Sequence, residues 1–288
     1  MQVIKRKTFA QQVNMEGFIV QQPLPASDLE QVDPFLLIHH ADHDYPGDQR
    51  PREVGVEPHP HRGFSPVTFV FEGNIQHRDS RGNDAIVEAG GMQWMHAGAG
   101  IIHSERPSRE LAQDGGKMEI VQVWVNTPAA RKMEQPSYMA IHENNIPTIE
   151  GKDGKSKIRV YAGTLEGQTG PAKLLSPILL ARLDMEAEGV ISFPLNKEFN
   201  TILYLLNGKI TFSDGASGRG REMLILNNDL DELSITCEAD TRMIVMAGKP
   251  LNEPLSANGP FVMNNQTQIL EAMRDYQMGK MGFLIEEF

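Results

Sequence analysis

Two short motifs, each with metal-binding side chains two residues apart, constrain this chain of 288 residues most strongly. The first motif carries His59 and His61, and the second carries His103 and Glu105. Residues i and i+2 of a β-strand point to the same face of a sheet, so each motif would present two donors on one side. Three imidazoles and one carboxylate suit a divalent transition metal that keeps positions open for water or substrate. The pattern therefore predicts two strands and a metal site between them.

The distribution of histidines supports this interpretation. All nine histidines lie between His39 and His142, and the rest of the chain has none. An isolated pair of histidines two residues apart is common on surfaces and in cores, whereas two such motifs with room for strands between them are more specific. Any imidazole chemistry therefore belongs to the N-terminal part of the chain.

Composition and charge exclude several classes of protein. The chain has no run of eighteen apolar residues, so we expect no membrane span. The basic N-terminus is not followed by an apolar segment, and the single cysteine, Cys237, has no partner for an internal disulfide. We therefore expect a cytoplasmic protein. A net charge of −11 without a cluster of Lys or Arg predicts that the protein does not bind nucleic acid directly.

The order of strands and turns predicts an all-β fold with an internal duplication. Residues 66–71 form a run rich in β-branched and aromatic residues, which is followed by a turn at Gly73. Residues 201–212 repeat this order of apolar strand, glycine turn and further strand around Gly208. The chain thus resembles two copies of an all-β unit of about 120 to 130 residues. We expect domains at 1–135 and 136–288, and a short C-terminal helix near 267–278 that buries Ile269, Met273 and Tyr276 on one face.

Alignment of the two halves on their turn glycines tests whether the second half repeats the first motif. His59 and His61 lie fourteen and twelve residues before Gly73. The same distances before Gly208 lead to Pro194 and Asn196. We therefore expect the C-terminal domain to keep the strands without the metal ligands.

Longer strings of residues connect these motifs to a known family. The strings HPHRGFSPVTFVFEG (59–73), HRDSRGN (77–83) and QWMHAGAGIIHSE (93–105) resemble the signature of the pirin family within the cupin superfamily. The segments AGKPLNEP (247–254) and GPFVMN (259–264) resemble that family too, so the likeness covers almost the whole chain. The resemblance implies a tandem cupin, or bicupin, of two double-stranded β-helix (jelly-roll) barrels. It also implies one metal, typically ferrous iron, in the N-terminal cupin.

The family's four metal ligands fall on His59, His61, His103 and Glu105. Pro66 stands where other cupins usually have a carboxylate ligand, and the carboxylate appears as Glu105 instead, which is a trait of the family. Imidazole suits several metals, so the ligands alone do not choose among iron, zinc, nickel, copper and manganese. From the family we expect Fe(II).

Two functions of different classes agree with this resemblance. The first is an oxidoreductase, a metal-dependent dioxygenase (quercetinase) resembling quercetin 2,3-dioxygenases, that cleaves a flavonol or a related enediol. In this hypothesis the proton of the 3-hydroxyl group is lost to Glu105, the candidate catalytic base, or to metal-bound hydroxide. The second is a non-catalytic, iron-binding regulatory protein that acts on a protein partner, as eukaryotic members are linked to transcription factors.

Four further residues are candidates for the surroundings of the metal or the pocket. Arg62 either contacts an anionic group of a substrate or forms a structural salt bridge. Gln93 either orients a ligand or lines the cavity, and His96 lies on the glycine-rich approach to the second motif. His39 lines the pocket mouth, forms a second metal patch with His40 and His43, or lies in a solvated loop. For His77 we favour a structural role in a strand or turn, with its ring hydrogen-bonded.

Overall fold

The computed structural model describes residues 2–15 and 18–286 and divides the chain into two compact units. The N-terminal barrel comprises the described residues of Asn14–Val20, Phe35–Asn144 and Asn252–Phe288. The C-terminal barrel comprises those of Met1–Val13, Gln21–Pro34 and Asn145–Leu251. These units differ from the continuous ranges 1–135 and 136–288 that we expected, because both ends of the chain pack with the barrel that is distant in sequence.

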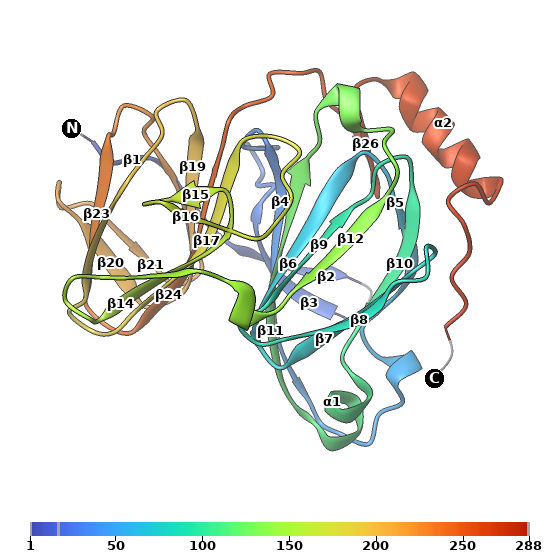
Figure 1. Cartoon of the computed structure of the whole chain (residues 1–288), viewed down its shortest axis with the longest axis horizontal. Helices are drawn as coiled ribbons and strands as arrows, with labels where there is room; N and C mark the ends of the chain where they lie inside the picture. Colours follow the sequence, from blue (N-terminus) through green and yellow to red (C-terminus); the bar gives the residue numbers. More distant parts are fainter. Residues whose placement is uncertain (1, 16–17, 287–288) are drawn as a thin grey trace. The chain divides into compact units, whose positions relative to one another are not determined.

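Both barrels are built from antiparallel strands in two sheets, which confirms the tandem cupin fold (Figure 1). In the N-terminal barrel the sheets have the orders β12-β9-β6-β11-β4-β3-β2 and β5-β10-β7-β8. The strands are β2 (Gln11–Met15), β3 (Phe18–Leu24), β4 (Phe35–Tyr45), β5 (Val56–His61), β6 (Phe64–Glu72), β7 (Asn74–Asp79), β8 (Asp84–Glu88), β9 (Met92–His96), β10 (Ile101–Arg106), β11 (Gly116–Asn126) and β12 (Ser137–Ile141).

The C-terminal barrel repeats this order as β18-β23-β20-β21 in one sheet and β1-β22-β19-β24-β17-β14-β13 in the other, as expected for a duplication. Its strands are β1 (Ile4–Phe9), β13 (Thr148–Glu150), β14 (Ser156–Ala162), β17 (Ile178–Met185), β18 (Val190–Pro194), β19 (Asn200–Asn207), β20 (Lys209–Phe212), β21 (Ser217–Arg219), β22 (Glu222–Leu226), β23 (Glu232–Cys237) and β24 (Thr241–Gly248). A small hairpin adds β15 (Thr164–Leu165) and β16 (Gln168–Thr169).

The C-terminal helix α2 spans Gln266–Gln277, close to the predicted range. Its buried side chains are Ile269 and Ala272, whereas Met273 and Tyr276 are 38% and 40% exposed. The prediction that Met273 lies on the docking face was therefore wrong, whereas Tyr276, although partly exposed, lies beside Phe261 with 6.4 Å between their ring centroids. The small Ala272 lets the helix approach an apolar cluster that contains Phe261, Met263 and Met281. The remaining elements are β25 (Ser256–Asn258), β26 (Phe261–Met263), α1 (Arg109–Asp114) and three single turns at Pro51–Glu53, Ala129–Arg131 and Glu143–Asn145.

The strand registers show which residues of the C-terminal barrel correspond to the two motifs. Asn74 and Lys209 follow the two turn glycines, so His77 corresponds to Phe212. Because His77 pairs with Glu105 and Phe212 pairs with Ile235, Glu105 corresponds to Ile235.

The next pairing extends the correspondence. His103 lies opposite His59, and Leu233 lies opposite Phe193. His61 then corresponds to Leu195, so the alignment on turn glycines, which gave Pro194 and Asn196, was one residue off. The C-terminal barrel has one more residue between this strand and its glycine turn. Every position of a predicted ligand thus carries an apolar side chain in the C-terminal barrel.

A buried lysine fixes residues 260–263 against the end of β5 in the N-terminal barrel. Lys132 is 1% exposed, and its ammonium group donates to the carbonyl oxygens of Gly63 (2.6 Å) and Val262 (3.1 Å) and to Oδ1 of Asn126 (2.6 Å). All three ammonium hydrogens therefore have acceptors, which is how a buried lysine charge is tolerated. The Gly63 carbonyl lies two residues after His61, so this contact supports one side of the predicted metal site.

We predict that Lys132→Met lowers the free energy of unfolding by about 2–4 kcal/mol, because three buried oxygens lose their donor. Urea denaturation of the full chain measures this. The matched control is Lys280→Met, because Lys280 also donates to a side-chain oxygen, that of Asp275, but its side chain is 51% exposed. Equal, small losses in both variants would contradict a supporting role for Lys132.

Candidate metal centre

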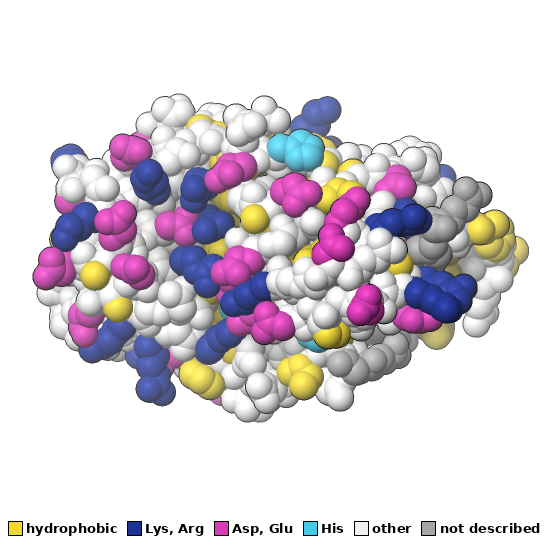
Figure 2. All heavy atoms as spheres, turned by 90° about the horizontal axis from the view of Figure 1, so that it is seen from below, with side chains coloured by type: hydrophobic (Ala, Val, Ile, Leu, Met, Phe, Trp, Pro, Cys, Tyr) yellow, Lys and Arg dark blue, Asp and Glu magenta, His cyan; other side chains and the backbone are white. Residues whose placement is uncertain are grey.

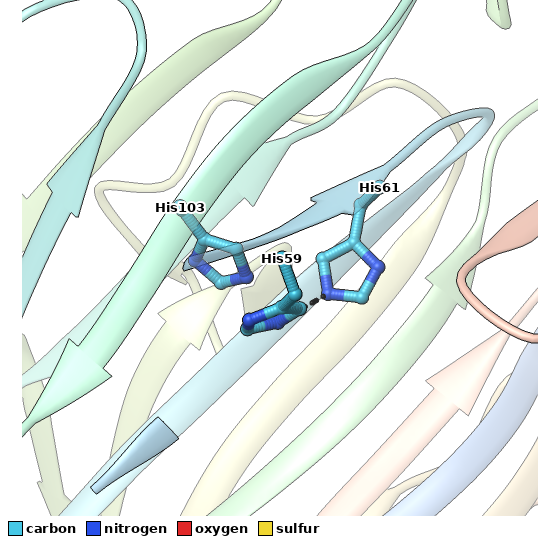
Figure 3. Close-up of side chains that lie close together, drawn as sticks. All are labelled: His59, His61 and His103. Carbon is cyan, nitrogen blue, oxygen red and sulfur yellow. Dashed lines mark hydrogen bonds between the residues drawn. The ribbon is translucent and has the colours of Figure 1, made fainter. Parts of the chain in front are cut away.

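Three of the predicted ligands meet between two neighbouring strands. His59 and His61 lie on β5 and His103 lies on β10, and the antiparallel register sets His103 opposite His59. One nitrogen from each ring lies within 4.8 Å of the other two, and the rings point toward one another (Figure 3). The alternation of side chains on a strand thus brings donors forty residues apart into one group.

The second nitrogen of each ring is held by another group. Nδ1 of His59 lies 2.7 Å from the carbonyl oxygen of Glu57, and Nδ1 of His61 lies 3.3 Å from that of Pro260. A carbonyl oxygen only accepts, so both Nδ1 atoms donate a hydrogen, and in the neutral rings Nε2 carries the lone pair. Nδ1 of His103 contacts Nδ1 of His77 at 3.3 Å, and its buried Nε2 has no hydrogen-bond partner among the described residues.

These nitrogens fit a divalent metal ion. Nε2 of His59 and Nε2 of His61 are 3.1 Å apart, where two facing lone pairs repel unless a proton or a cation lies with them. Two metal–nitrogen bonds of about 2.1 Å at right angles separate their nitrogens by about 3.0 Å. The three Nε2 atoms would hold the metal.

The protonation state also suits ligands. Burial lowers the pKa of His61 well below its ordinary value, and the neighbouring His59 lowers it further. Burial likewise lowers the pKa of His103, with added effects of His59, His61 and His77. Both rings are therefore neutral near pH 7, and the neutral imidazole is the form that binds metal.

Glu105 lies on the same strand, two residues after His103, and is 7% exposed. Within the described part of the chain, the group of donor atoms consists of the three histidines and leaves out Glu105. Its Oε1 accepts hydrogen bonds from Gln93 and from Thr68 (3.3 Å), and its Oε2 accepts one from Gln122 (2.8 Å). Glu105 as the fourth ligand stays a prediction.

The two glutamines that bind this carboxylate are themselves oriented by aromatic side chains. The hydroxyl of Tyr138 donates to Oε1 of Gln93 (3.1 Å), and Nε1 of Trp124 donates to Oε1 of Gln122 (3.0 Å). Each amide oxygen thus has its own donor, which leaves the amide hydrogens for Glu105. Gln93 was a candidate from the sequence, whereas Gln122 was not. The available signal was a polar residue within the apolar alternation of residues 119–125.

Three other candidates lie outside the group of histidines. Arg62 donates to the carbonyl oxygen of Ala99 (2.7 Å) and pairs with Asp275 of α2 (3.1 Å), which is the structural salt bridge among our two alternatives. His96 is buried on β9 near the hydroxyl of Ser65 (3.5 Å). His39 lies on β4 directly opposite Gln122, the residue that donates to Oε2 of Glu105.

Comparison with known proteins identifies the family. Residues 17–125 match the family described as Pirin, and residues 180–282 match the Pirin C-terminal cupin domain. The chain belongs to the pirin family. A pirin-like protein of Caulobacter vibrioides is 33% identical over 270 residues, covering 92% of this chain and 93% of that protein.

Solved structures of the family share the fold. A crystal structure of quercetin 2,3-dioxygenase from Acinetobacter baumannii is 33% identical, with a TM-score of 0.91 and coverage of 98% of this chain and 99% of that one. A bacterial pirin of Escherichia coli in complex with nickel(II) is 18% identical, with a TM-score of 0.65 and coverage of 85% and 99%. At that identity the second likeness supports the fold alone.

The outer surface adds little to the site. Among the described residues no helix is long and apolar enough to cross a membrane. Lysine and arginine side chains alternate with acidic ones over the face seen in Figure 2, so that face carries no extended basic patch.

The buried ring of His39, which is not one of the three ligands, should make the stability of the protein depend on pH. Burial lowers its pKa from 6.5 to about 4. Below pH 6.5 the unfolded chain therefore takes up a proton that folded His39 does not take up, and stability falls until about pH 4. We predict that the free energy of unfolding of His39→Gln falls less between pH 6.5 and about pH 4 than that of the wild type. Urea denaturation of the metal-free protein measures this. The exposed His142→Gln is the control, and an unchanged slope in His39→Gln would contradict the prediction.

Proposed function

We propose that the N-terminal barrel is a metal-dependent dioxygenase that cleaves a flavonol or a related cyclic enediol, with Fe(II) as its metal. The observation that carries this proposal is the convergence of three histidine Nε2 atoms whose Nδ1 atoms are all engaged elsewhere. The likeness to a structure named quercetin 2,3-dioxygenase supports the choice of substrate class. Imidazole ligands also suit zinc, nickel, copper and manganese, so the choice of iron belongs to the proposal.

The metal would supply Lewis acidity, which lowers the pKa of a bound hydroxyl group, and a site for dioxygen. His59, His61 and His103 would hold it, and Glu105 would complete the set. In the overall reaction the flavonol and dioxygen are consumed, the central ring opens, and carbon monoxide is released.

Glu105 is the proposed base. A flavonol must lose the proton of its 3-hydroxyl group, and a carboxylate oxygen of Glu105 can accept it. Gln93 and Gln122 hold the carboxylate by both oxygens, so its direction is fixed before a substrate arrives. A fixed acceptor loses little entropy at the moment of proton transfer.

Aromatic side chains beside the histidines favour a planar substrate. The rings of Phe64 and Trp124 lie 4.3 Å apart between centroids, and each contacts His61 edge-on, at 5.0 Å and 5.3 Å. Such rings pack against other aromatic rings with the same preference for offset or edge-on contacts. A flavonol bound at the three histidines would therefore meet aromatic neighbours.

We also place this activity in the cytoplasm, because the single cysteine, Cys237, is a free and buried thiol. A small molecule is the proposed partner of the site, and nucleic acid is not. The small-molecule partner rests on the metal site and on the likeness to quercetin 2,3-dioxygenase, and the exclusion of nucleic acid rests on the net charge.

The deciding experiment supplies ferrous iron to the protein under anaerobic conditions and then measures quercetin loss, oxygen uptake and carbon monoxide. We expect iron-dependent turnover that His61→Ala abolishes, because that variant removes one of three donors. Parallel loading with zinc, nickel, copper and manganese identifies the metal that supports turnover. Stoichiometric metal binding with no loss of quercetin or of related enediols would overturn the enzymatic proposal.

We predict that Glu105→Gln retains part of the metal but loses most turnover, because the amide cannot accept the substrate proton. Metal content by elemental analysis and the rate of quercetin loss are measured on the same preparation. The control is Glu72→Gln, a partly exposed glutamate at the end of β6. Turnover at the wild-type rate in Glu105→Gln would show that another group is the base.

The second candidate function is iron-dependent binding of a protein partner without catalysis. Exposed apolar side chains near the end of the chain favour it: Leu270, Phe283 and Ile285 are 58%, 78% and 86% exposed. Large apolar side chains that are exposed in the isolated chain can be covered in a protein interface. Metal binding without turnover, in the experiment above, would move the assignment to this candidate.

A further inference from the structure

His103 differs from the other two histidines in what holds its second nitrogen. His59 and His61 use backbone carbonyl oxygens, whereas His103 uses the ring of His77, with 3.3 Å between the two Nδ1 atoms. His77 in turn contacts Oδ2 of Asp79 through its Nε2, at 3.0 Å. All three side chains are buried, with exposures of 1%, 0% and 3% for His103, His77 and Asp79.

His103, His77 and Asp79 thus form a row linked by two hydrogen bonds. The carboxylate of Asp79 determines which atom donates in each bond. A carboxylate only accepts, so Nε2 of His77 carries the hydrogen that points to Asp79. With its hydrogen on Nε2, His77 presents a lone pair at Nδ1, which accepts the Nδ1 hydrogen of His103. His103 is left with its lone pair on Nε2, which is the nitrogen without a hydrogen-bond partner in the described structure. The row therefore selects one tautomer of His103.

Asp79 is itself held in place. Its Oδ1 accepts from the backbone N–H groups of Arg81 (2.8 Å) and Asn83 (3.1 Å), and its Oδ2 accepts from Nδ2 of Asn83 (2.7 Å). Burial acts to raise the pKa of Asp79, but the hydrogen bonds from His77, Asn83 and Arg81 outweigh it and hold the pKa below its ordinary value. The row thus ends on a fixed carboxylate.

The plane of His77 is fixed as well. Its ring stacks on Tyr138 with 3.9 Å between centroids and an angle of 8°. A partial rotation of the ring would break this stack, and a half-turn would break both hydrogen bonds. His77 therefore presents its Nδ1 to His103 in a single orientation.

The C-terminal barrel shows that the fold does not need a histidine at this position. Phe212 stands at the position of His77, and Asp214 stands at the position of Asp79. Asp214 still accepts from the backbone N–H group two residues later, of Ala216 (2.9 Å), as Asp79 does from Arg81. The aspartate thus serves the turn in both barrels, whereas the histidine occurs only where a ligand lies beside it.

We propose that His77 and Asp79 are positioning residues, which hold His103 as the Nδ1–H tautomer and so present its Nε2 to the metal. This inference rests on the metal site of the proposed function. Groups that orient a ligating histidine through its other nitrogen commonly change metal affinity by about 10–100-fold when they are removed. The matching residue of the second barrel supplies the test variant, His77→Phe, which keeps a ring to stack on Tyr138 and removes both hydrogen bonds.

The first measurement uses metal-free full-length protein at pH 8 and records the tautomers of the histidines from their 15N shifts. We expect His103 as the Nδ1–H tautomer in the wild type and as a mixture of tautomers in His77→Phe. His77→Asn, whose amide oxygen can still accept from His103, should retain more of the original tautomer. A wild-type His103 with its hydrogen on Nε2, or a fixed tautomer in His77→Phe, would overturn the proposal.

The second measurement is the affinity for Zn(II), from competition with a chelator, because zinc does not change oxidation state. We expect His77→Phe to bind Zn(II) about 10–100-fold more weakly than the wild type, with His77→Asn between them. The control is His40→Phe, which breaks another buried histidine–carboxylate pair, to Glu119 at 3.1 Å, outside the group of ligands. It should lose stability but not affinity.

The two measurements separate the inference from the function on which it rests. A wild-type protein that binds no Zn(II), Fe(II) or Ni(II) would overturn the proposed function. The tautomer measurement would still test whether His77 and Asp79 fix the tautomer of His103. Tight binding by the wild type and equal binding by His77→Phe would overturn the positioning role and leave the proposed function standing.

Discussion

The antiparallel pairing of β5 with β10 is the constraint on which the site depends, because it sets His59 opposite His103. A shift of one residue in this pairing would turn one set of donors to the outer face of the sheet. The pairing also creates an electrostatic problem, since the neutral rings of His61 and His103 direct lone pairs into the space that Nε2 of His59 also faces. A cation resolves this repulsion, and the contacts to Glu57, Pro260 and His77 hold the other nitrogens so that no ring can turn away.

The two barrels have the same strand order but differ in the side chains of their interiors. In the N-terminal barrel, Thr68, Gln93 and Gln122 lie at positions that the registers match to Leu203, Leu224 and Val245 in the C-terminal barrel. Those apolar residues belong to one hydrophobic core, together with Phe193, Phe212, Leu233 and Ile235. A polar interior adds little stability unless every group has a partner, so a barrel that packs apolar residues is the simpler solution. The polar interior of the N-terminal barrel is therefore explained by chemistry rather than by folding.

Much of this could be predicted from the sequence, because alternation on strands is a local property. The spacing of His59, His61 and His103 predicted their common face, and the repeated turn glycines predicted the duplication. The contacts of Gln122 and His77 could not be predicted, since they depend on registers between strands that are far apart in sequence. For the same reason the alignment on turn glycines missed by one residue, and the packing of α2 through Ala272 was not anticipated.

The outer face of the same strands explains how the site can be rigid. Ser104 and Arg106 alternate with His103 and Glu105 on β10, and both bind the carboxylate of Glu286, at 2.7 Å and at 2.9 and 2.8 Å. Arg62, next to His61, pairs with Asp275 of α2, and the chain after α2 runs beside β10 (Figure 1). The strands that carry the donors are thus held from outside by charged pairs and from inside by the glutamines. Donors held on both faces need little rearrangement when a metal binds, so the C-terminal segment supports the site, directly through Pro260 at His61 and indirectly through Asp275 and Glu286.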